Sequence, residues 1–151
     1  MARPTRLLTA LSAGDRDRLM AHARDATFPQ DARIFDEEGE ADRFWIIRSG
    51  TVALDLRIPG RRPATVDTLG MGDLLGWSWL FPPQVWHFGA RAFSPVRAHE
   101  FRAAEVRALC EADHSLGYAL ALAVAEILSQ RVEVARTKLL DEYVRHGAPG
   151  L

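Results

Sequence analysis

Apolar and polar residues alternate in short runs through the middle of the chain, from Thr27 to Val106. Glycine and proline residues separate these runs at intervals of about ten residues. Short, evenly spaced runs with turn residues between them are typical of a sandwich or jelly roll rather than of alternating strands and helices. The runs that we expect to be strands are Ala26–Phe28, Arg33–Phe35, Arg43–Ser49, Thr51–Arg57, Ala64–Leu69, Leu74–Leu75, Ala90–Phe93 and Val96–Phe101.

The pattern is helical on either side of these runs. Ser12-Ala13-Gly14-Asp15 predicts a capped helix that ends near Ala23, and Ala103–Glu111 predicts a second helix. A long helix over Leu116–Val144 follows, capped by Asp113 or Ser115. The fold class is therefore mainly β with flanking helices: a β-roll (double-stranded β-helix or jelly roll) followed by a long C-terminal helix. We divide the chain into an N-terminal helical segment, a β-roll domain, the C-terminal helices and a tail: residues 1–25, 26–106, 107–145 and 146–151.

Two apolar stripes run along the long helix. The first comprises Leu116, Leu120, Ala123, Ile127 and Val134, and we expect it to face the β-roll. The second steps by four and three residues, which is the seam spacing of a two-helix contact, so we expect it to contact the same helix of a second copy. The predicted homodimer interface is Ala125, Leu128, Val132, Ala135 and Leu139. The alternative, that both stripes pack onto the same domain, stays open.

Composition narrows the functional classes. The 151 residues are 48% hydrophobic, which fits one globular domain, and the formal net charge of −1 gives no electrostatic signature of nucleic-acid binding. The single cysteine, Cys110, excludes an internal disulfide and fits a reducing compartment. No apolar run approaches the roughly 20 residues needed to span a bilayer. We therefore expect a cytoplasmic protein with no membrane association.

Aromatic residues concentrate between Leu69 and Ala92, where three of the four tryptophans lie. Trp77–Phe81 predicts one or two helical turns that start at a glycine and stop at Pro82, and such a helix start favours a small anion. Residues 86–92 predict the start of a strand facing this turn, so the two limbs form a pocket wall. The predicted ligand-binding residues are Gly76, Trp77, Ser78, Trp86, His87, Phe88 and Arg91.

Few residue patterns in the sequence suggest catalysis or metal binding. The five histidines are scattered and include no His-x-His pair, and the acidic residues between Asp36 and Asp42 are typical of a solvated turn. Ser78 near His87 is the one candidate for a nucleophile and base, and such a pair is more often coincidental. We expect no enzyme activity, no catalytic residue, no metal and no cofactor.

Two motifs resemble the cyclic nucleotide-binding domains of the Crp/Fnr family. In Ile34–Val52, an apolar residue, acidic residues and a glycine precede the run Trp45-x-Ile47-x-x-Gly50-x-Val52, and Leu69-Gly70-x-Gly72-Asp73-x-x-Gly76 follows. The resemblance covers roughly Leu7 to Tyr143. It implies a regulatory β-roll in which occupancy of a phosphate-binding cassette moves the long helix.

Two anchor positions depart from the family pattern. Where the family has a glutamate for the ribose this chain has Trp77, and where it has an arginine for the cyclic phosphate this chain has Trp86, or His87 with a one-residue shift. The family's purine-binding hydroxyls on the long helix fall near Ala135 and Arg136. Two lost charge-assisted hydrogen bonds weaken binding by about a hundred- to ten-thousand-fold. The aromatic residues either fill the former pocket or line a slot for a flat or apolar ligand.

These features predict a stand-alone, non-catalytic sensor or adaptor that does not bind cyclic AMP in the usual way. Crp/Fnr regulators carry a helix-turn-helix domain after the long helix, and only a short tail follows it here, so we expect no direct DNA binding. The expected partners are a second copy, a nucleotide-like or other small ligand, and a protein partner. The alternative is a structural interaction module with a self-filled pocket, which docks through Trp79, Phe81 and Pro82-Pro83.

Overall fold

The computed structural model describes residues 4–147 and contains two four-stranded antiparallel sheets. The first has the order β1-β8-β3-β6 and the second has the order β2-β7-β4-β5. The strands are β1 Arg24–Phe28, β2 Arg33–Phe35, β3 Arg43–Ser49, β4 Val52–Leu56, β5 Ala64–Leu69, β6 Leu74–Leu75, β7 Gly89–Ala92 and β8 Val96–Arg102. All eight predicted strands form, with small differences at their ends, and the predicted β-roll is confirmed.

Aromatic residues of β3 connect the layers of the core. Successive side chains of a strand point to opposite faces, so Phe44 and Trp45 have different neighbours. The Phe44 ring stacks on Phe101 of β8 and on Trp79, at centroid distances of 4.8 and 4.7 Å. The Trp45 ring faces the second sheet and stacks on Phe35 of β2 at 5.7 Å. Both faces of this strand are therefore buried.

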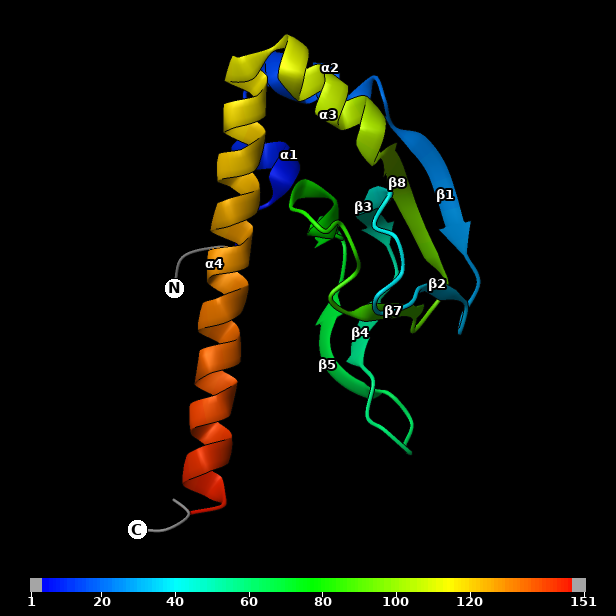
Figure 1. Cartoon of the computed structure of the whole chain (residues 1–151), viewed down its shortest axis with the longest axis vertical. Coiled ribbons are helices and arrows are strands. Elements are labelled where there is room, and N and C mark those ends of the chain that lie inside the picture. The colour runs from blue at the N-terminus through cyan, green and yellow to red at the C-terminus, as the bar shows by residue number, and fades with distance from the viewer. Residues whose placement is uncertain (1–3, 148–151) are drawn as a thin grey trace.

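In the described part of the chain, four α-helices flank the sheets: α1 Leu7–Ala10, α2 Ala13–Met20, α3 Ala103–Ala112 and α4 His114–Arg145 (Figure 1). The Ser12 side chain accepts a hydrogen bond from the backbone N–H of Asp15, as the predicted cap requires. The prediction that this helix continues to Ala23 is wrong. The chain turns after Met20 and enters β1 at Arg24, where it pairs with β8.

Only the first half of α4 is covered by the β-roll and the other helices. Leu116, Leu120, Ala123 and Ile127 of the first stripe are buried, but Val134 is 52% exposed, so its predicted inward position is wrong. The second half of the helix runs on beside β5 and past it (Figure 1). Its helical part ends at Arg145, and most of the predicted tail lies outside the described residues.

The second stripe remains open to solvent along most of its length. Ala125, Val132, Ala135 and Leu139 are exposed in the single chain, with Leu139 at 71%, and Leu128 is half-buried. The two stripes therefore do not both pack onto the β-roll domain, because the second one is largely exposed. Whether a second copy covers the exposed stripe stays a prediction. Within residues 4–147, no helix combines the length and apolar character that crossing a bilayer requires.

Candidate functional site

The segment after Gly76 forms a single short 3₁₀ turn. Gly76 has a φ of +94°, which favours glycine, and the turn that follows spans only Ser78–Leu80. Its hydrogen bonds run from Leu80 to Trp77 and from Phe81 to Ser78. One helical turn is therefore present, as the lower limit of the predicted one or two, and it is a 3₁₀ turn. A three-residue turn has no developed helix dipole, so we do not retain the expected anion site at its start.

Trp86 is held in the core by its backbone. Its N–H donates to the Gly39 carbonyl oxygen and its own carbonyl oxygen accepts from Glu38 N–H, both at 2.8 Å. The indole is 4% exposed and stacks on Phe35, with ring centroids 3.9 Å apart and planes 13° apart. On another side it approaches Gly76, where a Cβ atom would lie 2.9 Å from Trp86 Cζ3. Phe35, Gly39 and Gly76 together fix the position of this side chain.

Six of the seven predicted ligand-binding residues meet around one small cavity, which we call the cassette cavity. Its volume is about 20 Å³, and a cavity of this size holds about one water molecule. Trp86 occupies the space beside Gly76. The cavity is lined by Phe35, Leu54, Gly76, Trp77, Ser78, Trp86, His87 and Phe88.

Arg91, the seventh predicted residue, lies apart from the cassette cavity. It extends from β7 to form an ion pair with Asp31 at 2.9 Å, and its guanidinium lies over the Phe93 ring. It lines neither the cassette cavity nor the two larger cavities described below.

Ser78 and His87 do form a hydrogen bond, between Oγ and Nδ1 at 2.8 Å. The His87 ring also stacks on Trp77 at 4.6 Å. Among residues 4–147, no carboxylate forms a hydrogen bond or ion pair with His87 that would orient it as a base. Ser78 is buried and faces the 20 Å³ cavity, which has no room for a substrate.

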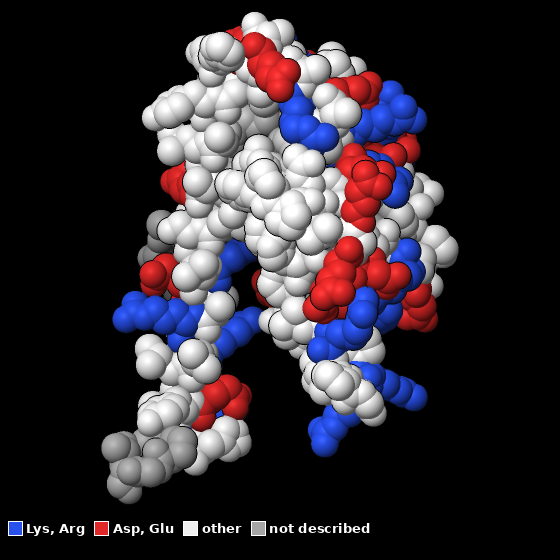
Figure 2. Space-filling model, in the orientation of Figure 1, with Lys and Arg blue, Asp and Glu red and all other residues white. Residues whose placement is uncertain are grey.

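A much larger cavity lies between the β-roll and α4, and we call it the α4 cavity. Its volume is about 390 Å³, within the usual range for small-molecule sites. Trp77 and Phe88 form part of its β-roll wall, and three residues of the predicted dimer stripe form part of its helix wall. The α4 cavity is lined by Leu56, Val66, Asp67, Trp77, Phe88, Leu128, Arg131, Val132 and Ala135. Figure 2 shows the open groove between α4 and the β-roll, with basic side chains beside it.

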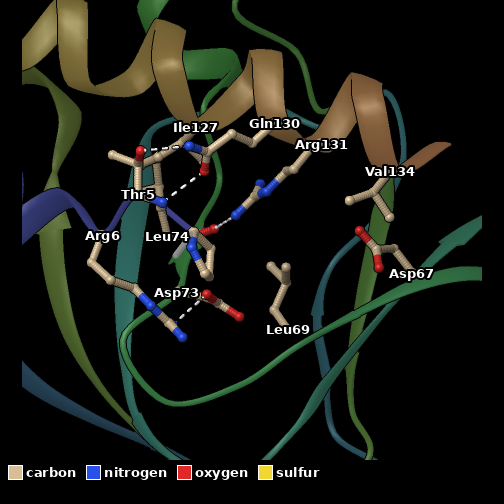
Figure 3. A pocket seen from close by; sticks show the side chains of 11 residues that line it. Thr5, Arg6, Asp67, Leu69, Asp73, Leu74, Ile127, Gln130, Arg131 and Val134 are labelled. Atoms are coloured by element: carbon tan, nitrogen blue, oxygen red, sulfur yellow. Dashed lines mark hydrogen bonds and ion pairs between the residues drawn. The ribbon is translucent and has the colours of Figure 1, made fainter. Parts of the chain in front are cut away.

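A third cavity of about 230 Å³ lies under the N-terminal segment, and we call it the N-terminal cavity (Figure 3). Thr5 ties this segment to α4: its N–H donates to Gln130 Oε1 at 2.6 Å, and its hydroxyl accepts from Gln130 Nε2 at 2.8 Å. The Arg6 guanidinium forms an ion pair with Asp73 in the turn between β5 and β6. Arg131 lines both this cavity and the α4 cavity and donates from Nη2 to the Leu74 carbonyl oxygen.

Sequence reasoning missed Arg131. Burial of its guanidinium lowers the pKa of Arg131, although the residue remains a cation. Its spacing was a usable signal, because Leu120, Ile127 and Arg131 share one helix face. A basic residue that continues a buried stripe marks a polar function on that face.

The comparisons with known proteins agree with this geometry. The family model described as "Cyclic nucleotide-binding domain" matches residues 26–113, more than half of the chain. Among curated protein sequences, none matches the chain.

Solved structures with the same fold cover most of the chain. A candidate cyclic nucleotide-binding protein from Geobacter metallireducens GS-15 is 26% identical, with a TM-score of 0.74, over 87% of this chain and 99% of that one. The N-terminal domain of a transcriptional regulator from Streptomyces coelicolor A3(2) is 23% identical, with a TM-score of 0.69, over 85% and 89% of the two chains. The Thermus thermophilus catabolite activator protein is 22% identical, with a TM-score of 0.73, over 88% and 61%. From the family match, supported by this fold, the chain belongs to the cyclic nucleotide-binding domain family.

Proposed function

We propose that this chain is a regulatory, non-catalytic domain that does not bind cyclic AMP or cyclic GMP in the usual cassette. The observation that carries the proposal is the position of Trp86. Its indole fills the space beside Gly76 and leaves a cavity of about 20 Å³. A cyclic nucleotide would have to displace an aromatic side chain from the core, at a cost of several kcal/mol by analogy with core truncations.

The ligand binds instead in the α4 cavity, which includes Trp77 and Ala135, at the positions that the resemblance assigns to the ribose and the purine contacts. Trp77 and Phe88 on the β-roll and Leu128, Val132 and Ala135 on α4 face each other across it. A ligand that contacts both walls has a different affinity for each position of the helix relative to the β-roll. Binding therefore shifts the equilibrium between helix positions, which is what a sensor requires.

A homodimer through α4 completes the proposal. An exposed apolar stripe that includes Ala125, Val132 and Leu139 needs a partner, and the same stripe of a second copy supplies one by symmetry. A protein partner then reads the position of the paired helices. We assign no DNA contact to the described residues, since the formal net charge of the chain is −1. A cytoplasmic location stays a prediction.

Calorimetric titration of the purified protein with cyclic AMP and cyclic GMP tests this function. We expect no heat of binding at micromolar nucleotide. Saturable binding in that range would show that the cassette still works and would overturn the proposal.

One observation favours a second candidate, a structural interaction module. Phe81 is 46% exposed, and the neighbouring Pro82 and Pro83 are exposed as well. Trp79 is buried against Phe44, so the predicted docking patch is smaller than expected. This alternative predicts that no small molecule changes the protein, whereas the first proposal requires a ligand in the α4 cavity.

A further inference from the structure

We infer that the ligand of the α4 cavity is an apolar monoanion, such as an arenecarboxylate, whose anionic group binds Arg131. This inference rests on the proposed function, because it names the class of ligand for the same cavity. It is carried by an incompletely paired cation at the junction of two cavities and by the apolar character of the remaining walls.

Most of the hydrogen-bond donors of Arg131 have no partner among the described residues. Its guanidinium carries five N–H donors, and among residues 4–147 it makes one hydrogen bond, to the Leu74 carbonyl oxygen. No carboxylate of these residues lies within ion-pair distance of it. A half-buried cation without a counter-ion is costly, and an anion that enters the cavity would relieve this cost.

The acidic residues nearest to Arg131 are already engaged. Asp73 pairs with Arg6 and accepts a hydrogen bond from the Gly70 N–H at 2.8 Å. Asp67 accepts from the Thr68 N–H at 2.8 Å and faces Lys138 at 3.8 Å. Both carboxylates act on Arg131 through space, but neither forms a direct contact with it (Figure 3). The charge of Arg131 is therefore available to a ligand.

The remaining walls select for an apolar body. Apart from Arg131 and Asp67, every residue around the α4 cavity is apolar, and two of them are aromatic. Trp77 and Phe88 suit a flat ring, whose faces and edges both pack well against aromatic side chains. The hydroxyl groups of a sugar would lose their hydrogen bonds to water against these walls. A cyclic nucleotide is therefore a poor occupant, although it too is an anion.

The test compares two probes of nearly equal size, 2-naphthoate and the uncharged 2-naphthalenemethanol, by calorimetric titration. The full chain is used as wild type and as three variants. Arg131→Gln removes the charge but keeps a donor for the Leu74 carbonyl oxygen. Arg136→Gln is the matched control, because Arg136 is exposed on the same helix and lines neither large cavity. Ala135→Trp fills the cavity from an exposed helix position.

We expect 2-naphthoate to bind the wild type at least about tenfold more tightly than the alcohol. Arg131→Gln should weaken the binding of 2-naphthoate by about ten- to a hundred-fold and leave the affinity for the alcohol unchanged. Arg136→Gln should change neither affinity, and Ala135→Trp should abolish both. Thermal melts establish that each variant is folded.

Several results would overturn the inference. These are equal affinity for both probes, an Arg131→Gln variant with unchanged 2-naphthoate affinity, and no binding of 2-naphthoate to the wild type. If the alcohol binds and Ala135→Trp blocks it, the cavity remains the ligand site and only the anionic class is refuted. Micromolar cyclic AMP binding, by contrast, refutes the proposed function itself.

Discussion

The indole of Trp86 lies flat against the ring of Phe35, with centroids 3.9 Å apart and planes 13° apart. This contact joins the segment after the prolines to β2. Trp86 stands at the position where the resemblance implies an arginine for the cyclic phosphate. The same indole also contacts Gly76. One side chain thus belongs to the core and, under the proposed function, also excludes the family's usual ligand.

Trp86→Ala should lower the free energy of unfolding by about 3–5 kcal/mol, because it leaves a large cavity in the core. Trp86→Phe keeps a ring against Phe35 and should lose less. Guanidinium unfolding followed by circular dichroism measures both differences. A loss below about 1 kcal/mol for Trp86→Ala would mean that the indole is not tightly packed.

Gly76→Ala should destabilise the protein for two reasons that act together. The φ of +94° disfavours an L side chain, and the new Cβ would lie 2.9 Å from Trp86 Cζ3. We expect a loss of at least about 1–2 kcal/mol in the free energy of unfolding. Gly70→Ala is the control, since a Cβ there meets nothing within 4 Å. Equal melting temperatures for the two variants would contradict the close approach of Trp86 to Gly76.

Asp113 caps α4, and this cap predicts that the stability of the protein depends on pH. The backbone N–H of Leu116 donates to Asp113 at 3.1 Å and, together with Arg18, lowers the pKa of Asp113 below its usual value. The folded state therefore prefers the charged carboxylate. The Asp113 carboxylate therefore adds to the free energy of unfolding above the pKa that Asp has in the unfolded chain, about 3.9. This contribution is lost as the pH falls through the lower pKa of Asp113 in the folded state.

Asp113→Asn caps the helix without titrating. Its melting temperature should therefore fall less than that of the wild type between about pH 5 and pH 2. Asp17→Asn, an exposed change with no capping contact, should follow the wild type. Thermal melts at a series of pH values compare the three proteins, and identical curves for Asp113→Asn and the wild type would rule out this role for Asp113.

Leu139→Glu should convert the proposed dimer to a monomer, because it places a charge in the exposed apolar stripe of α4. Thr137→Glu adds the same charge two residues earlier, on another face of the helix, and should leave the dimer intact. Sedimentation velocity at tens of micromolar distinguishes the two. A wild-type monomer in this range, or equal effects of the two changes, would contradict the interface.

Much of the fold could be predicted because local pattern determined it. Alternating runs bounded by glycines such as Gly50 identified the strands, and the long apolar spacing identified α4. The errors came from tertiary context. Val134 continues the buried stripe in sequence, but the covered part of α4 ends before it. The alternative of an interaction module required Trp79 at the surface, but it stacks on Phe44 in the core.

The candidate site was predictable only in part. Gly76, Trp77 and Trp86 lie in one segment of the sequence. The sequence left open which aromatic residues are core and which line a cavity, and the structure separates them. Trp86 packs beside Gly76 in the core, while Trp77 forms a wall of the α4 cavity. That cavity joins the neighbouring strands β4 and β5 to α4, which is far from them in the chain. The helix spacing puts Arg131 on the buried face of α4, but no local pattern shows that β4 and β5 lie opposite it.

The central claim, that Trp86 closes the cassette, is tested most directly by ¹⁹F NMR of protein labelled with 5-fluorotryptophan. The four tryptophans give four signals, which single Trp→Phe variants assign. We predict that micromolar cyclic AMP leaves the Trp86 signal unchanged, and that 2-naphthoate shifts Trp77 without shifting Trp86. A saturable shift of the Trp86 signal by micromolar cyclic AMP would contradict this account.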